Sequence, residues 1–385
     1  MGKKIKVGVI ISNPIDHEIP LFQNLSLFHN IELTVIFLDR ERIKSFNTFG
    51  LKNINYGINV LEGYNYTFLK NISPFKSLRW KYINPSVIKY LHKHKFDVVI
   101  SYGYNSITTL IALFVCNKMK VPILLRTEAE SVQRVSALKR FIRKIILPVI
   151  YKKYNGFLAI CKANSDHYIK YQVPSKLIWD VPQTILFKNF FINQHSPIDL
   201  KERFHIPESS IIFIYGSKLR NEKRPEDVVK AFCSLNEDVK AHLLVLSDGP
   251  LRKKCESIVT KANKNRQVTF TGYLDFELLT QVYQASDVLI ASSSETVGSV
   301  LYQGLAAGLA IISSDKIAGW FDIIQPGING LIYRCGNIDA LTTSIEALAN
   351  NVALIKSMKS NSKQFAKHFN PISTGGKLIN VLNQY

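Results

Sequence analysis

Several features that mark particular classes of protein are missing from this sequence of 385 residues. Its five cysteines are scattered and include no Cys-x-x-Cys pair, which argues against a zinc site or a disulfide framework and favours a reducing compartment. The first residues run straight into an apolar strand and lack the core and cleavage site of a signal peptide. The longest apolar runs fall well short of the roughly 20 residues that span a bilayer. We therefore expect a cytoplasmic protein, or one that lies at the inner face of the membrane.

Common nucleotide and metal motifs are missing as well. The sequence contains no Gly-x-x-x-x-Gly-Lys-Ser/Thr loop, which excludes a P-loop NTPase. The first strand does not lead into Gly-x-Gly-x-x-Gly, which disfavours a dinucleotide-dependent dehydrogenase. No Asp-x-Asp occurs, and carboxylates are the ligands that a diphosphate-bridging Mg²⁺ would need. We expect neither a metal ion nor a cofactor.

Acidic residues are scarce in the first half of the chain. Residues 1–195 contain 28 Lys and Arg against 11 Asp and Glu, whereas residues 196–385 contain 21 against 18. A basic half predicts an anionic partner, which can be a nucleic acid, an acidic substrate or an anionic membrane surface. No recognisable nucleic-acid motif accompanies the charge, so we expect no nucleic-acid partner.

Short apolar runs alternate with helical patterns along most of the chain. This alternation predicts an α/β protein with doubly wound parallel sheets. The length of the chain suggests two domains. Residues 46–84 are rich in Asn, Tyr and Phe and have weak periodicity, which predicts an irregular insertion. A polar stretch with two prolines predicts a linker at 189–209, between domains at 1–188 and 210–368.

One expected helix, at residues 136–154, carries many basic residues. Apolar residues recur at helical spacing at positions 138, 141, 142, 145, 146, 149 and 150, and six Lys or Arg lie between or beyond them. Pro148 is expected to kink or interrupt the helix. A basic amphipathic helix is typical of a membrane-surface element, and each Lys or Arg near an anionic surface contributes about 1 kcal/mol. The alternative is a helix that packs its apolar side on the core and has a basic outer face.

Polar side chains follow two expected strands of the first domain. Asn13 and His17 lie in the loop after the strand at 4–12, and Arg126, Glu128 and Glu130 lie at the tip of the strand at 121–126. Ligands of doubly wound sheets bind at the carboxyl ends of the strands. These side chains are therefore candidates for binding a substrate, although each can equally be an ordinary surface residue.

A second group of candidates follows strands of the second domain. Lys218 and Lys223 come after an apolar strand at 211–215, and Glu295 follows another strand at 288–291. The helix that begins near Thr296 carries Gln303. Strand ends of one sheet converge on one edge, and two lysines beside a helix N-terminus suit a diphosphate.

The residues from 287 to 333 resemble the nucleotide-sugar site of the family 4 retaining glycosyltransferases, part of the glycosyl transferases group 1. That family has the GT-B fold, which consists of two Rossmann-like doubly wound parallel-sheet domains with a cleft between them. Its Glu, seven residues, Glu pattern falls on Glu295 and Gln303 in this sequence. Its Gly-Arg-Leu…Lys-Gly segment is similar to 216–224, with Lys218 at the Arg position and Lys223 at the Lys position.

The resemblance implies a role for each matching residue. Glu295 would contact the hydroxyls of the donor sugar, and Lys218 and Lys223 would bind the donor diphosphate, whose growing charge they would stabilise. The resemblance also implies that a C-terminal helix at 369–385 returns to the first domain. That domain is expected to bind the acceptor through Asn13, His17, Arg126 and Glu128, because of their place at the strand ends. The further donor-binding residues would be Gly216, Ser217, Asp248, Gly249, Tyr273, Thr296, Val297, Gly298 and Gln303.

The sequence departs from the family at three points. Gln303 replaces the carboxylate expected to hold the ribose, Lys218 lacks the bidentate geometry of Arg, and the first domain has no glycine-rich first loop. The resemblance implies a retaining, metal-independent glycosyltransferase that uses a nucleoside-diphosphate sugar and a glycan or lipid-linked acceptor, with a role in cell-surface polysaccharide biosynthesis. A nucleotide-sugar epimerase of the same fold, or an inactive nucleotide-sugar-binding protein, remains an alternative.

Overall fold

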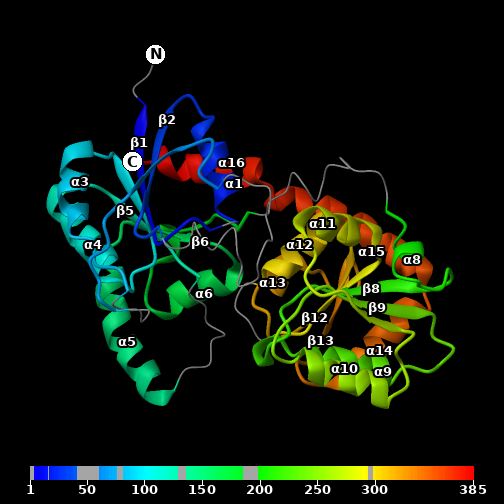
Figure 1. Cartoon of the computed structure of the whole chain (residues 1–385). Helices are drawn as coiled ribbons and strands as arrows, with labels where there is room; N and C mark the ends of the chain where they lie inside the picture. Colours follow the sequence, from blue (N-terminus) through cyan, green and yellow to red (C-terminus); the bar gives the residue numbers. More distant parts are fainter. Residues whose placement is uncertain are drawn as a thin grey trace. The chain divides into compact units, whose positions relative to one another are not determined.

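The structure, a computed structural model, describes residues 4–15, 17–40, 60–75, 81–128, 136–184, 198–293 and 298–385. The chain forms two compact units (Figure 1). Unit 1 comprises Met1–Thr184 together with Asn370–Tyr385, and unit 2 comprises Ile185–Phe369. The end of the chain therefore belongs to the same compact unit as its beginning.

The described part of unit 1 contains a sheet of seven parallel strands in the order β3-β2-β1-β4-β5-β6-β7. The strands are β1 Ile5–Ile11, β2 Ile31–Phe37, β3 Asn65–Phe68, β4 Val98–Tyr102, β5 Ile123–Arg126, β6 Gly156–Ala159 and β7 Ile178–Asp180. The helices are α1 Ile19–Ser26, α3 Ser86–His94, α4 Ile107–Met119, α5 Ala137–Tyr151, α6 Lys162–Lys170, the short η1 Ser175–Leu177 and the C-terminal α16 Pro371–Leu382.

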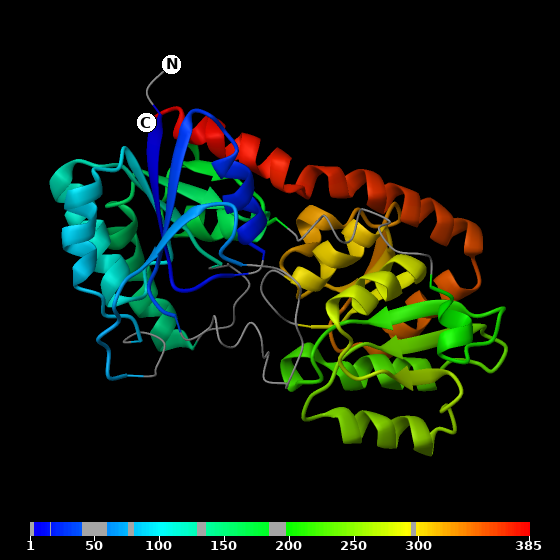
Figure 2. The same ribbon diagram turned by 45° about the horizontal axis from the view of Figure 1, so that its top comes forward.

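Two apolar layers enclose this sheet. Helices α1 and α16 lie side by side on one face, where their buried residues pack on β1 and β2 (Figures 1 and 2). Helices α3, α4 and α6 cover the other face, together with the last two turns of α5. Helix α4 begins with a capping box, in which Ser106 and Thr109 satisfy each other's main-chain N–H groups.

Among its described residues, unit 2 has a sheet of six parallel strands in the order β10-β9-β8-β11-β12-β13. The strands are β8 Ile211–Tyr215, β9 Ala241–Val245, β10 Val268–Phe270, β11 Val288–Ala291, β12 Ala310–Ser314 and β13 Gly330–Tyr333. The helices are α8 Leu200–Arg203, η2 Asn221–Lys223, α9 Pro225–Cys233, α10 Arg252–Lys261, α11 Phe276–Ala285, α12 Ser299–Ala307, α13 Trp320–Ile323, α14 Ile338–Ala349, α15 Val352–Ala366 and η3 Lys367–Phe369.

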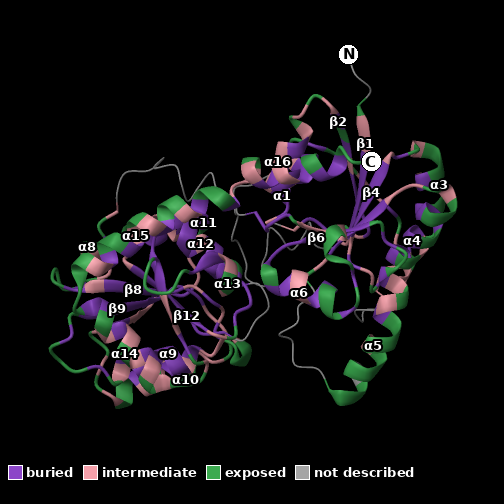
Figure 3. Ribbon diagram, turned by 180° about the vertical axis from the view of Figure 1, so that it is seen from behind, coloured by how far each residue is buried: buried purple, intermediate pink, exposed green. Residues whose placement is uncertain are grey.

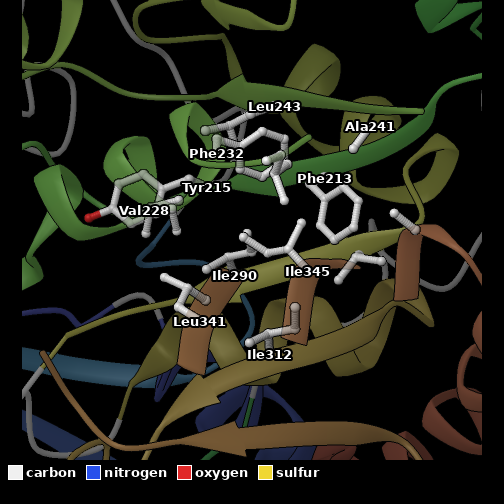
Figure 4. Packing of buried hydrophobic residues seen from close by; sticks show 14 of the residues in the cluster. Phe213, Tyr215, Val228, Phe232, Ala241, Leu243, Ile290, Ile312, Leu341 and Ile345 are labelled. Atoms are coloured by element: carbon white, nitrogen blue, oxygen red, sulfur yellow. The ribbon is translucent and has the colours of Figure 1, made fainter. Parts of the chain in front are cut away.

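The core of unit 2 lies where α9, α10 and α14 cover one face of this sheet, while α11, α12 and α15 cover the other (Figure 1). Phe213, Ile290 and Ile312 of three neighbouring strands meet Phe232 of α9 and Ile345 of α14 (Figure 4). Burial on both faces explains why these strands are continuous apolar runs in the sequence.

The two doubly wound parallel sheets confirm the expected fold class. The interpretation of 46–84 as irregular was wrong at residues 65–68. Residues 65–68 form the edge strand β3, which pairs with β2 from Asn65 opposite Thr34 to Phe68 opposite Phe37. Phe68 stacks on Phe37 with ring centroids 5.1 Å apart, so cross-strand aromatic packing compensates for the polar sequence. Pro148 does not interrupt α5, which continues to Tyr151.

Of the expected linker, residues 189–197 lie outside the described part of the chain. Residues 198–209 contain α8, which Asp199 caps by accepting from the main-chain N–H groups of Lys201 and Glu202.

Candidate active site

The strand order of unit 2 creates a switch point between β8 and β11. The chain leaves β8 toward β9 on one side and returns on the other side at β11. Loops that follow these two strands diverge, and ligands of open parallel sheets bind where they do so. The segment 216–224 follows β8, and Gln303 lies on α12, the helix after β11.

Hydrogen bonds join the loop after β8 to the loop after β9. The main-chain N–H of Leu219 donates to Asp248 O at 3.1 Å, and Ser247 Oγ donates to Ser217 O at 2.5 Å. Gly249 is required for this contact, because a Cβ at that position would lie 2.5 Å from the carbonyl oxygen of Leu219. Four of the predicted donor-binding positions therefore lie next to one another: 216, 217, 248 and 249.

The Asp248 side chain holds its own turn. One carboxylate oxygen accepts from Gly249 N at 2.7 Å, and the other accepts from Arg252 Nη1 at 2.9 Å. The hydroxyl of Tyr273 donates to the main-chain oxygen of Asp248 at 3.0 Å. Burial, and then the charge of Asp248, raises the pKa of Tyr273, so this hydroxyl remains a donor.

The loop that carries the two lysines is also joined to β11. The main-chain oxygen of Lys223 accepts from Tyr215 Oη at 2.9 Å and from Ser292 Oγ at 2.7 Å. Ser292 follows β11 directly, so this bond crosses the switch point. The side chains of Lys218 and Lys223 are both half-buried at this edge of the sheet. Neutral hydroxyl and main-chain groups thus hold in place the loop that carries both lysines.

Gly216 and Gln303 are linked through Tyr283 of α11. Tyr283 is 1% exposed, and its hydroxyl donates to Gln303 Oε1 over 3.5 Å, a long hydrogen bond. A Cβ on Gly216 would lie only 2.0 Å from that hydroxyl, which explains why glycine follows β8. Burial raises the pKa of Tyr283, which keeps the hydroxyl protonated as a donor toward the amide.

The segment between β11 and α12 contains the predicted carboxylate. Glu295, Thr296 and Val297 lie outside the described residues. Gly298, directly after them, has φ 74°, and a Cβ there would meet Ile317 at 2.3 Å, so glycine is needed where α12 begins. On the other side of the segment, Ser314 Oγ donates to Ser293 O at 2.6 Å.

In unit 1, two of the predicted acceptor-binding side chains lie together. His17 Nε2 is 3.5 Å from Glu128 Oε1, and Glu128 is the more exposed of the pair. Asn13 is buried, and its Nδ2 donates to Pro14 O at 3.0 Å, so its amide organises its own loop. Glu130 lies outside the described residues.

Arg126 has a different setting from the exposed strand tip that the sequence suggested. It is 1% exposed, and two of its nitrogens donate to Glu18 Oε1 at 3.0 and 3.2 Å. Its Nη1 donates to Val181 O at 2.6 Å and its Nη2 to Pro182 O at 3.3 Å. The hydroxyl of Tyr102 donates to the other Glu18 oxygen at 2.7 Å. Arg126 therefore ties three segments of unit 1 together from inside.

Three residues with roles at these edges were missed from the sequence: Tyr283, Ser292 and Arg252. Tyr283 and Ser292 form hydrogen bonds with residues that are distant in the chain, and Arg252 bonds to Asp248, which also forms its own turn. No local sequence pattern indicates these contacts. The described residues contain no cluster of three or more His, Cys, Asp or Glu side chains that could hold a metal ion.

Comparison with known proteins assigns the second unit to a protein family. Residues 198–365 match the family model of the glycosyl transferases group 1. The second unit is a domain of that family. The resemblance of this unit to the group 1 glycosyltransferases, predicted from the sequence, is thus confirmed.

Relatives and solved structures extend the likeness over the whole chain. An uncharacterized glycosyltransferase of Methanocaldococcus jannaschii is 26% identical over 342 residues, which are 78% of this chain and 85% of that protein. The lipopolysaccharide 1,6-galactosyltransferase of Escherichia coli is 30% identical over 138 residues, 35% of this chain and 38% of that protein. A crystal structure of Anabaena HepE in complex with UDP-glucose has a TM-score of 0.72 and 13% identity, and the match covers 99% of this chain and 100% of that one. Both units of this chain therefore have the GT-B fold.

Proposed function

We propose that this protein is a retaining glycosyltransferase that moves a sugar from a nucleoside-diphosphate sugar to a glycan or lipid-linked acceptor. It would need neither a metal ion nor a cofactor, and it would work in the cytoplasm, at the inner face of the membrane, in cell-surface polysaccharide biosynthesis. The observation that carries the proposal is the bond from Ser292 to the main chain of Lys223, which brings the lysine loop and the β11 loop together at the switch point. The UDP-glucose complex of a protein with the same fold supports the choice of donor.

In this proposal the leaving diphosphate is stabilised by cations of the protein. As the anomeric C–O bond breaks, negative charge grows on the diphosphate, and Lys218 and Lys223 would neutralise it. Glu295 would hold the hydroxyls of the donor sugar, and Gln303 would contact the ribose. The Gln303 side chain accepts from Tyr283 at one end, so its amide nitrogen is the group suited to meet a ribose oxygen. No covalent nucleophile on the protein is proposed.

The test is a two-step assay. A thermal-shift screen of UDP-, GDP- and ADP-sugars first identifies the donor, because a ligand that binds only the folded state raises the melting temperature. Transfer of labelled sugar to extracted lipid-linked acceptor is then measured for the parent and for Lys218→Ala, Lys223→Ala and Glu295→Ala. Each lost charge-assisted hydrogen bond should lower kcat/KM about 10- to 100-fold. The matched control is Lys230→Ala, an exposed lysine on α9.

Three outcomes contradict the proposal in distinguishable ways. Undiminished transfer in the lysine and glutamate variants would remove their assigned roles. A rearranged nucleotide-sugar formed without acceptor would point to an epimerase. Binding of a nucleotide-sugar with no turnover and no rearrangement would point to a binding protein.

A further inference from the structure

Helix α5 turns an apolar face to the outside of unit 1. Six large apolar side chains on it are between 44% and 70% exposed: Leu138, Phe141, Ile142, Ile145, Ile146 and Val149. Leu147 and Tyr151, which join α5 to the core, are 3% and 2% exposed. Figure 3 shows the exposed colour along the part of α5 that projects from the unit. The stripe identified in the sequence therefore does not face the core, and that alternative was wrong.

The exposed apolar residues form one face of the helix, and its cations lie on the other sides. Residues 138, 141, 142, 145, 146 and 149 are three or four apart, so they share one side of a helix that is about 22 Å long. Arg140, Arg143 and Lys144 lie on the remaining sides, exposed or half-buried, and Lys152 and Lys153 follow the last turn. No Asp or Glu occurs anywhere in 136–154.

We propose that α5 is an interfacial helix that docks unit 1 on an anionic lipid surface. The apolar face would enter the boundary between headgroups and acyl chains, while the Lys and Arg stems would reach back to the phosphates. Charge indicates which partner covers the apolar face of α5. A second copy of this chain would bring another row of cations against the first, whereas an anionic bilayer complements both the apolar face and the cations. No helix in the described ranges is long and apolar enough to span a bilayer.

The docked helix would also orient the ligand edge of unit 1. Helix α5 precedes β6, and a helix in a parallel βα unit runs opposite to its strand, so α5 begins at the carboxyl edge of the sheet. His17 and Glu128 lie at that same edge. If the proposed function holds, lipid docking would bring this edge close to a lipid-linked acceptor, but docking itself does not depend on that function.

The experiment is flotation of the full-length protein with vesicles of phosphatidylglycerol mixed with phosphatidylcholine, and with vesicles of phosphatidylcholine alone. The parent should bind the mixed vesicles, and less so at high salt. Phe141→Ser with Ile145→Ser should weaken binding at least about tenfold, because two apolar side chains no longer leave water. The control is Val352→Ser with Ile372→Ser, which changes two side chains of similar exposure on α15 and α16 and should leave binding unchanged.

A second pair of variants separates charge from apolarity. Replacing Arg140, Arg143 and Lys144 by Gln should reduce binding to the anionic vesicles about a hundredfold. Replacing three exposed lysines of unit 2 by Gln is the matched control: Lys230, Lys253 and Lys261. Equal losses in variant and control, or no binding by the parent, would overturn the proposal. So would a dimer in sedimentation velocity that Phe141→Ser with Ile145→Ser dissociates, or a melting temperature lowered by that pair as much as by Leu147→Ser, since the face would then be covered by protein.

Discussion

The carboxyl edges of the two sheets use charge in different ways. In unit 1, Arg126 and Glu18 pair in the interior and hold three segments of the unit together. In unit 2, main-chain and hydroxyl groups hold the loop after β8, and two half-buried lysines lie on that loop. At the edge of unit 1, charged side chains therefore stabilise the fold. At the edge of unit 2, neutral groups position the loop that carries the charged Lys218 and Lys223. The proposed donor diphosphate would bind at the second edge, and variants that remove one type of bracing should separate the two edges.

The largest effect is expected from Arg126→Met. It leaves the Glu18 carboxylate buried without its cation, which should cost about 3–5 kcal/mol of unfolding free energy for unit 1. Arg252→Met in unit 2 breaks ion pairs whose side chains are about a third exposed, so it should cost about 1 kcal/mol or less. Urea unfolding measures both costs.

Two further results sharpen this contrast. Glu18→Gln combined with Arg126→Met should cost less than Arg126→Met alone, because no unpaired charge remains. Binding of the nucleotide-sugar to folded protein should survive both Arg126 variants. If Arg126→Met is no more costly than Arg252→Met, the distinction between the two edges is wrong.

The next effect concerns pH. Unit 1 buries the ion pair of Arg126 and Glu18, whereas unit 2 buries a neutral histidine, His242. Burial lowers the pKa of His242 to about 4 from 6.5. Between these values the unfolded chain binds a proton that the folded chain does not. The stability that His242 contributes is therefore complete above pH 6.5 and is lost as the pH falls toward 4, by about 3 kcal/mol at most.

The variant His242→Gln tests this pH dependence. Its unfolding free energy should fall less than that of the parent between pH 7 and pH 4, when both are measured in urea. His205→Asn, a change at an exposed histidine, should keep the dependence of the parent. A His242→Gln profile that runs parallel to the parent would show that this ring does not set the acid sensitivity of unit 2.

Much of this contrast could not be read from the sequence. Apolar runs such as 211–215 and 288–291 predicted the parallel strands correctly, because both faces of those strands are covered. Arg126 looked exposed because its partner, Glu18, lies 108 residues earlier, and no local pattern reports such a distant pairing. The strand β3 was missed because its Asn, Tyr and Thr side chains suit an edge position and give no apolar run.

Periodicity had a similar limit for α5. It identified which residues share one side of the helix, but it could not say whether that side meets the core. The buried residues, Leu147 and Tyr151, lie off the stripe. In unit 2, the lysines could be placed at the sheet edge from their position after β8, whereas Tyr283 could not, since its link to Gly216 exists only in three dimensions.

A smaller effect is expected from Gly216→Ala. The new Cβ would lie 2.0 Å from the Tyr283 hydroxyl, and the forced shift should cost about 1–3 kcal/mol of stability. Because that hydroxyl also contacts Gln303, donor affinity should fall as well. Urea unfolding and thermal-shift titration with the identified nucleotide-sugar measure the two losses.

A double variant provides the control for this steric argument. Tyr283→Phe removes the clashing oxygen and leaves the ring carbon that bore it 3.1 Å from the new methyl group. Gly216→Ala should therefore cost less in the Tyr283→Phe background than in the parent. An equal cost in both backgrounds would mean that backbone freedom, and not Tyr283, requires glycine at 216.

The smallest effect tests the bond on which the proposed donor site depends. Ser292→Ala removes the hydroxyl that donates to Lys223 O and to Arg224 O, while Lys223 O keeps its bond from Tyr215. Stability should fall by about 1 kcal/mol. Ser313→Ala removes an equally buried hydroxyl, on β12, that does not touch the lysine loop, so it should cost a similar amount of stability. Only Ser292→Ala should also weaken nucleotide-sugar binding, about threefold to tenfold, because only that change loosens the loop that carries Lys223. Equal affinities in the two serine variants would show that the bond from Ser292 does not position the lysines. The contrast drawn between the loops of unit 2 and those of unit 1 would then fail.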